Sequence, residues 1–210
     1  MDEKLVSLTA GMRVPYGGNN VAIVSEELAS EFESGDRLIV IQTTGDLLHI
    51  PADVWDISFK TVEQAHNAFL EMGSVDDDSI TKFFKLFADY LSDDERFSAI
   101  KDSNDEDVRI ARSKGRSTTR LILSKKMRTD MVAGLRLWEN TPSQRGSAIE
   151  EINHDGWNVK LITAGLGAVG FIFEGRPNVF ADATGVLRSG NTVVFRIGSD
   201  ALLTANAIVE

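Results

Sequence analysis

Hydrophobic and polar positions change their spacing along the chain and divide it into three parts. In the first, residues 1–74, short apolar runs with strand-like spacing are separated by turn residues. Residues 21–24 form a candidate strand, and the helical spacing of residues 26–33 predicts a helix after it. Residues 37–50 carry two apolar runs around a Thr-Gly-Asp turn and predict a β-hairpin, and a short helix is expected over residues 61–70.

The second part, up to about residue 150, has the period of amphipathic helices. An acidic run at 76–78 precedes a helix over 79–90, whose stripe consists of Ile80, Phe83, Phe84, Phe87 and Leu91. Ser92 and Glu95 have the spacing of a capping box and predict the start of a second helix. A third helix is expected around residues 108–111, and a fourth from Ser124.

From Trp157 onward, strands and helices alternate. The pattern predicts strands over 157–163, 169–173 and 192–195, and helices over 178–188 and 199–210. The continuous apolar run at 169–173 is typical of a buried parallel strand. The expected fold class is therefore α/β.

Composition and charge exclude several kinds of protein. A net charge of −10 over 210 residues argues against a nucleic-acid partner. No apolar run approaches the ~18–20 residues that a membrane span requires, and the first residues lack the layout of a signal peptide, so we expect a cytoplasmic protein. The chain has no cysteine, which excludes disulfides and a thiolate nucleophile within it. His49, His66 and His154 lie too far apart to indicate a metal site.

Two local patterns allow more than one interpretation. Eight basic residues lie between Arg109 and Arg128, and a solvated face balanced by nearby acids is favoured over an anion site. Gly165, Gly167 and Gly170 spell G-x-G-x-x-G, the spacing of a dinucleotide-binding turn. That motif has to open a helix, whereas these glycines precede a strand, so a structural role is favoured.

Two longer motifs carry a family resemblance. GLGAVGFIFEGRPNV (residues 165–179) and LRSGNTVVFRIGSDA (residues 187–201) resemble motifs of the glutamate-5-semialdehyde dehydrogenases, or γ-glutamyl phosphate reductases, of the aldehyde dehydrogenase superfamily. The resemblance covers roughly residues 79–210. It implies that residues 75–210 form a helical cluster and the first part of a Rossmann-type NAD(P)-binding sheet. Residues 1–74 would be an additional α+β module.

The resemblance also implies an activity. Such enzymes reduce an acyl phosphate to an aldehyde: a cysteine thiolate displaces phosphate, and NADPH then delivers hydride. A kinase would supply the acyl phosphate, and a homo-oligomer is expected. Because this chain has no cysteine, we expect it to be inactive by itself. The alternatives are a non-catalytic cofactor-binding or scaffold subunit, and a reductase portion that acts on another activated acyl group.

By the same resemblance, Asn178 would donate a hydrogen bond to the oxyanion formed during acyl transfer; a plain helix cap is the alternative. The residues that would bind NADPH or NADP are Glu174, Arg176, Pro177, Arg196, Gly198 and Ser199. Ser199 could also cap the helix that follows it. Ile197 departs from the family pattern, which usually has glycine there, and a branched side chain could crowd the cofactor. No metal is expected.

Overall fold

The computed structural model describes residues 4–210, which form two compact units. The first unit ends at Glu63 and the second comprises Gln64–Glu210. Helix α2 (Ala52–Met72) runs through this division. The expected module of residues 1–74 and domain of residues 75–210 stay a prediction.

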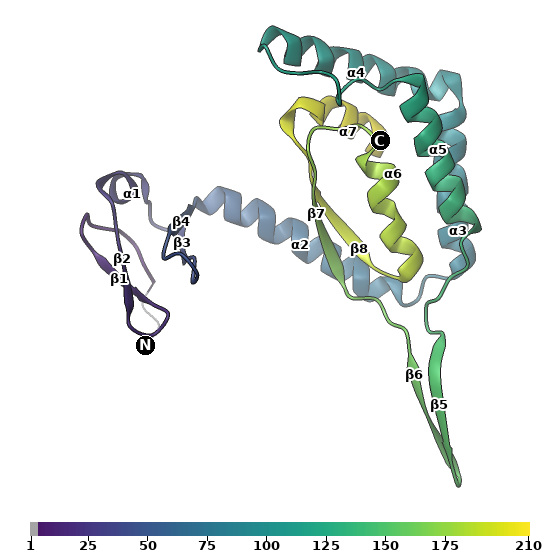
Figure 1. The fold of residues 1–210 in the computed structure, drawn as a ribbon, viewed down its shortest axis with the longest axis horizontal. Helices are drawn as coiled ribbons and strands as arrows, with labels where there is room; N and C mark the ends of the chain where they lie inside the picture. Colours follow the sequence, from purple (N-terminus) through teal and green to yellow (C-terminus); the bar gives the residue numbers. More distant parts are fainter. Residues whose placement is uncertain (1–3) are drawn as a thin grey trace. The chain divides into compact units, whose positions relative to one another are not determined.

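The first unit consists of two small antiparallel hairpins and a short helix, drawn in purple and blue in Figure 1. Its elements are β1 (Arg13–Tyr16), β2 (Asn20–Ile23), α1 (Glu26–Glu31), β3 (Arg37–Val40) and β4 (Leu47–Ile50). The hairpin predicted over residues 37–50 is confirmed by the pairing of β3 with β4, while β1 was not predicted. Leu8, Val24 and Phe32 form the core of this unit.

Helices dominate the start of the second unit. They are α3 (Asp77–Ser92), α4 (Asp94–Ser113) and α5 (Lys125–Asn140), which follow the end of α2. The α2 helix is longer than the short helix predicted over 61–70. The amphipathic stripe of α3 is largely confirmed, because Phe84 and Leu91 are fully buried and pack with Met131 and Leu135 of α5.

The prediction of two helices between Ser92 and Gly115 is wrong, since α4 is one continuous helix. The predicted capping box is also absent. Asp93, not Ser92, is the N-cap, and its carboxylate accepts from the Arg96 N–H at 2.9 Å. The Ser92 hydroxyl instead donates backwards to the Ala88 carbonyl at 2.7 Å. Several residues in this run are of a type that can cap a helix, and only the three-dimensional path of the chain selects one of them.

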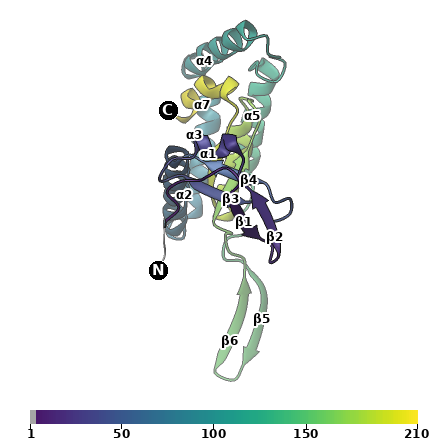
Figure 2. The ribbon, with the colours of Figure 1, turned by 90° about the vertical axis from the view of Figure 1, so that its left-hand side faces the viewer.

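A long antiparallel hairpin follows α5. It pairs β5 (Ala148–His154) with β6 (Trp157–Ile162), and Figures 1 and 2 both show it extending away from the rest of its unit. The strand predicted from Trp157 is confirmed, but its partner β5 was not predicted. Every residue of both strands is exposed.

The end of the second unit has the predicted α/β alternation. Its elements are β7 (Ala168–Ile172), α6 (Val179–Ala183), a 3₁₀ helix (Thr184–Ser189), β8 (Thr192–Arg196), a 3₁₀ turn (Ser199–Ala201) and α7 (Leu202–Val209). β7 and β8 pair in parallel, as predicted. The expectation that the first of these strands is buried is wrong: Ile172 is 83% exposed. Helix α6 packs against this strand pair. The ring of Phe180 contacts the ring of Phe195 edge to face, with 4.8 Å between the ring centroids.

Together, the helical cluster and the parallel strand pair confirm the predicted fold class. Within residues 4–210, no helix is both long and apolar enough to cross a membrane.

Candidate functional site

The turns that follow β7 and β8 lie side by side at the carboxyl ends of the two strands. Ile172 is in register with Arg196, and the Phe173 N–H donates to the Arg196 carbonyl at 2.8 Å. The parallel pairing therefore brings the predicted residue Glu174 and its neighbour Gly175 beside the turn of residues 196–199, whereas Asn178 lies further on, at the start of α6. Ligands of open α/β sheets bind at this end of the strands.

Gly198 allows the two turns to pack closely. A Cβ at this position would lie 2.7 Å from the Gly175 nitrogen and 3.1 Å from its Cα, which is too close for any residue but glycine. Gly198, a predicted cofactor residue, therefore permits the close approach of the neighbouring turn.

Arg196 and Ser199 both present exposed side chains at this end of the sheet. Within residues 4–210, Arg196 forms no ion pair, so its guanidinium is available to an anionic ligand. The prediction that Ser199 caps the next helix is wrong, because neither the 3₁₀ turn nor α7 has a side-chain cap.

A carboxylate from another helix holds the first turn of α7 instead. Asp107 of α4 accepts from the Thr204 N–H at 2.8 Å, from its hydroxyl at 2.7 Å and from the Leu203 N–H at 3.3 Å. Asn104, one turn earlier, donates to the Leu121 carbonyl and to the Thr204 hydroxyl, and accepts from the Leu123 N–H at 2.8 Å. This buried network gives a structural role to both Asn104 and Asp107, which lie three residues apart in α4. The positive end of the α7 helix dipole therefore already interacts with a carboxylate of the protein, that of Asp107.

Ile197 packs against other residues of the protein. Its half-buried side chain contacts the cluster of Val108, Ala111, Leu121 and Ala201 between α4 and α7. That this side chain could crowd a cofactor stays a prediction.

Asn178 lies at the start of α6, behind the buried Pro177. Its side chain makes no capping hydrogen bond, so the alternative of a plain helix cap is wrong. Its Nδ2 donates to Oδ2 of Asp182 at 3.0 Å, while its Oδ1 is buried and has no hydrogen-bond partner among residues 4–210. Both residues border a hollow of about 280 Å³ between α5 and α6, which Lys126 and Asp130 also line.

The surroundings of Asp182 change the pKa of its carboxyl. Partial removal of water raises this pKa above the ordinary aspartate value, and the positive charge of Arg176 opposes that rise. Arg176 itself has a buried Nε that finds no hydrogen-bond partner among the described residues. Among residues 4–210, no group of three histidine, cysteine or acidic side chains could hold a metal ion.

Acidic residues balance much of the basic stretch, as the favoured interpretation expects. Five of its eight side chains form ion pairs: Arg109 with Glu106, Arg116 with Asp200, Arg120 with Glu174, Lys126 with Asp130 and Arg128 with Asp94. The pairs of Arg116 and Arg120 reach across to the two turns of the candidate site. Glu174, a predicted cofactor residue, is therefore engaged by Arg120.

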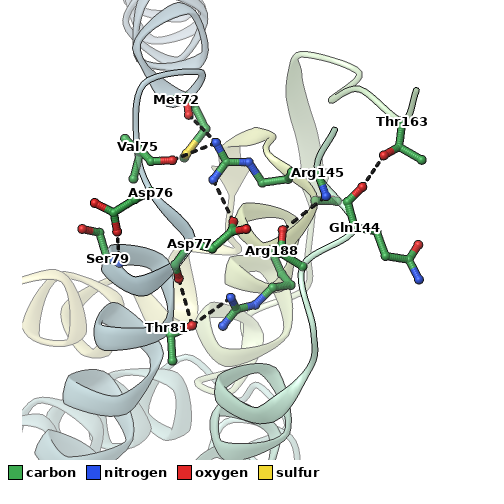
Figure 3. A network of polar contacts seen from close by, with 12 residues as sticks. Met72, Val75, Asp76, Asp77, Ser79, Thr81, Gln144, Arg145, Thr163 and Arg188 are labelled. Atoms are coloured by element: carbon green, nitrogen blue, oxygen red, sulfur yellow. Dashed lines mark hydrogen bonds and ion pairs between the residues drawn. The ribbon is translucent and has the colours of Figure 1, made fainter. Parts of the chain in front are cut away.

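Two further arginines connect segments of the second unit, and no sequence pattern predicts either role. Arg145 donates to the carbonyls of Met72 and Val75 at 2.8 and 2.9 Å and pairs with Asp77 (Figure 3). Arg188 is buried and donates to the Thr81 hydroxyl and to the Trp138 carbonyl at the end of α5. These contacts tie the base of the β5–β6 hairpin and the segment before β8 to the start of α3.

Comparison with known proteins confirms the resemblance seen in the sequence. The γ-glutamyl phosphate reductase of Heliobacterium modesticaldum is 33% identical to this chain over 153 residues, which are 70% of this chain and 36% of that protein. The chain thus spans about a third of the length of the curated relatives it matches. No protein-family model matches it.

Solved structures agree on the fold. The crystal structure of γ-glutamyl phosphate reductase from Thermotoga maritima matches 72% of this chain and 37% of its own, with a TM-score of 0.66 and 30% identity. The protein of the same name from Saccharomyces cerevisiae matches 71% of this chain and 39% of its own, with a TM-score of 0.64 and 22% identity.

Proposed function

We propose that this chain is the cofactor-domain portion of a γ-glutamyl phosphate reductase-like enzyme, which reduces an acyl phosphate to an aldehyde with NADPH. The observation that carries the proposal is the similarity in sequence: over 153 residues, this chain is 33% identical to a γ-glutamyl phosphate reductase. The geometry is compatible with it, because the two parallel strands end in adjacent turns that hold Glu174, Arg196 and Ser199. The substrate class is a γ-glutamyl phosphate, and the product is glutamate 5-semialdehyde, as in proline biosynthesis.

In this proposal, Arg196 and Ser199 bind the phosphate and ribose groups of the dinucleotide. Both side chains are exposed at the carboxyl end of β8, and Arg196 has no competing ion pair among the described residues. The bound dinucleotide supplies the hydride. Glu174, Arg176 and Pro177 belong to the adjacent turn, which would border the same ligand.

Asn178 has the role of oxyanion donor. Its amide is not used for capping and borders a hollow. Such a donor lowers the barrier to acyl transfer by about 3–4 kcal/mol. The thiolate that attacks the acyl carbon must come from outside these residues, because the chain has no cysteine.

Titration of the 210-residue chain with NADPH, followed by NADPH fluorescence, tests the cofactor site. Arg196→Ala should weaken binding by about 1–3 kcal/mol, the range for loss of a charge-assisted hydrogen bond. Arg112→Ala, which removes an exposed arginine from the last turn of α4, is the matched control and should bind as the parent does. Equal binding by the Arg196→Ala variant and the parent would remove the cofactor assignment and favour a scaffold role.

The proposed enzyme acts as a homo-oligomer and follows a kinase that makes its acyl phosphate. The β5–β6 hairpin supports self-association. Ile152, Val159, Leu161 and Trp157 form an exposed apolar row along it, and an isolated two-stranded ribbon is marginally stable in water.

A further inference from the structure

The structure gives the amide of Asn178 a partner that fixes its orientation. Asp182 lies one turn further along α6, and its Oδ2 is 3.0 Å from the Asn178 Nδ2. The i, i+4 spacing places the two side chains on the same face of the helix. Val179, Phe180 and Ala183, which lie on other faces of α6, are buried, so the backbone that carries the pair is held by packing.

An ionised carboxylate discriminates between the two orientations of an amide because it can only accept hydrogen bonds. With Nδ2 toward Asp182, Asn178 donates one N–H and keeps the other free within the described residues. A flipped amide would place Oδ1 against the carboxylate, where two acceptors repel each other. Within the part of the chain that the structure describes, the buried Oδ1 has no partner of its own, so no other hydrogen bond there selects the orientation.

We propose that Asp182 is a positioning residue, which holds the Asn178 amide with its nitrogen toward the carboxylate and its second N–H free to donate. The value of this free donor for acyl transfer rests on the proposed function, while the orientation itself does not. Protonation of Asp182 removes the discrimination, since a neutral carboxyl can both donate and accept.

The other charged groups that face this pair are Arg176, before α6, and Lys126 and Asp130 on α5. Lys126 and Asp130 pair with each other at 2.6 Å. Asp182 is thus the carboxylate bonded to the amide, and Asp130 is a neighbouring carboxylate that serves as a control.

The experiment follows the side-chain amide resonances of Asn178 in the 15N-labelled 210-residue chain as a function of pH. Asn178→Ser identifies the resonances by removing them. In the parent chain, the amide signals should shift in a single step, at a pH above the ordinary pKa of an aspartate. Asp182→Asn should abolish this step, Asp182→Glu should retain one, and Asp130→Asn should leave the parent step in place.

Two results would overturn the proposal: a pH step that persists in the Asp182→Asn variant, or a parent chain whose Asn178 amide does not respond to pH. Loss of the step in Asp130→Asn to the same extent would also reject it.

Unchanged dispersion of the backbone amide signals shows that each variant folds. Should Asp182→Asn fail to fold, the parent titration and Asp182→Glu still decide. NADPH binding plays no part here, so a failed cofactor titration leaves this result intact, and the reverse also holds.

Discussion

Replacing Asp107 with alanine should destabilise the second unit far more than replacing any exposed acid of the same helix. Asp107 is 3% exposed, and its carboxylate accepts three hydrogen bonds from Leu203 and Thr204 at the start of α7. The variant removes the acceptor of these bonds and leaves the buried Thr204 N–H without a partner, which costs about 1–3 kcal/mol. This loss is a large part of the ~5–15 kcal/mol that stabilises a typical domain.

Urea unfolding measures this loss when the fluorescence of Trp138 reports on the second unit alone. Trp55 and Trp157 are first replaced by phenylalanine so that only one indole contributes. Asp105→Ala is the matched control. Asp105 lies two residues away on α4 and forms an exposed pair with Lys101, whose removal should cost less than about 1 kcal/mol.

Equal midpoints for the two variants would refute the reasoning, because they would show that the buried network contributes nothing beyond a surface pair. Amide hydrogen exchange gives a local check. Protection at the Thr204 N–H should fall in Asp107→Ala and remain in Asp105→Ala.

Two further predictions concern single positions. Ile197→Gly should lower the unfolding midpoint rather than improve NADPH binding, because the side chain fills the cluster between α4 and α7; a stable variant with tighter binding would contradict this. Hydrogen bonds from the Glu33 N–H and from His49 lower the pKa of Asp36. A carboxyl with a lowered folded-state pKa stabilises the fold above its unfolded-state pKa, and that stability is lost as pH falls through the folded-state pKa. Circular dichroism should therefore show that the first unit loses stability as the pH falls through the folded-state pKa of Asp36. Asp36→Asn should make the stability of this unit less dependent on pH over the same interval.

Local chemistry made parts of the fold predictable. The helices α3 and α5 follow from apolar residues at helical spacing, with Ser124 as the N-cap of α5. The hairpin over residues 37–50 follows from two apolar runs around a turn. Parallel pairing of β7 and β8 follows from their alternation with helices. Each of these signals is contained within a few neighbouring residues.

Other features required contacts between distant residues. The strand β5 carries several charged and polar residues and has no periodicity that distinguishes it from a loop, so only its pairing with β6 defines it. The choice of Asp93 over Ser92 as N-cap depends on how α3 ends. Arg145 and Arg188 acquire their roles from carbonyls far away in the sequence.

The candidate site also combines features that follow from the sequence with features that depend on tertiary contacts. The sequence by itself determined the residues at the ends of the two parallel strands, and through its motifs the family that they resemble. Tertiary structure decided what each side chain does. In the folded chain, Ile197 packs against a buried cluster, and Asp182 lies against the amide of Asn178. Asp107, rather than Ser199, accepts the hydrogen bonds of the first turn of α7. The physical reason is that a motif specifies residue types along the backbone, whereas the hydrogen bonds and burial of a side chain depend on the elements that pack around it.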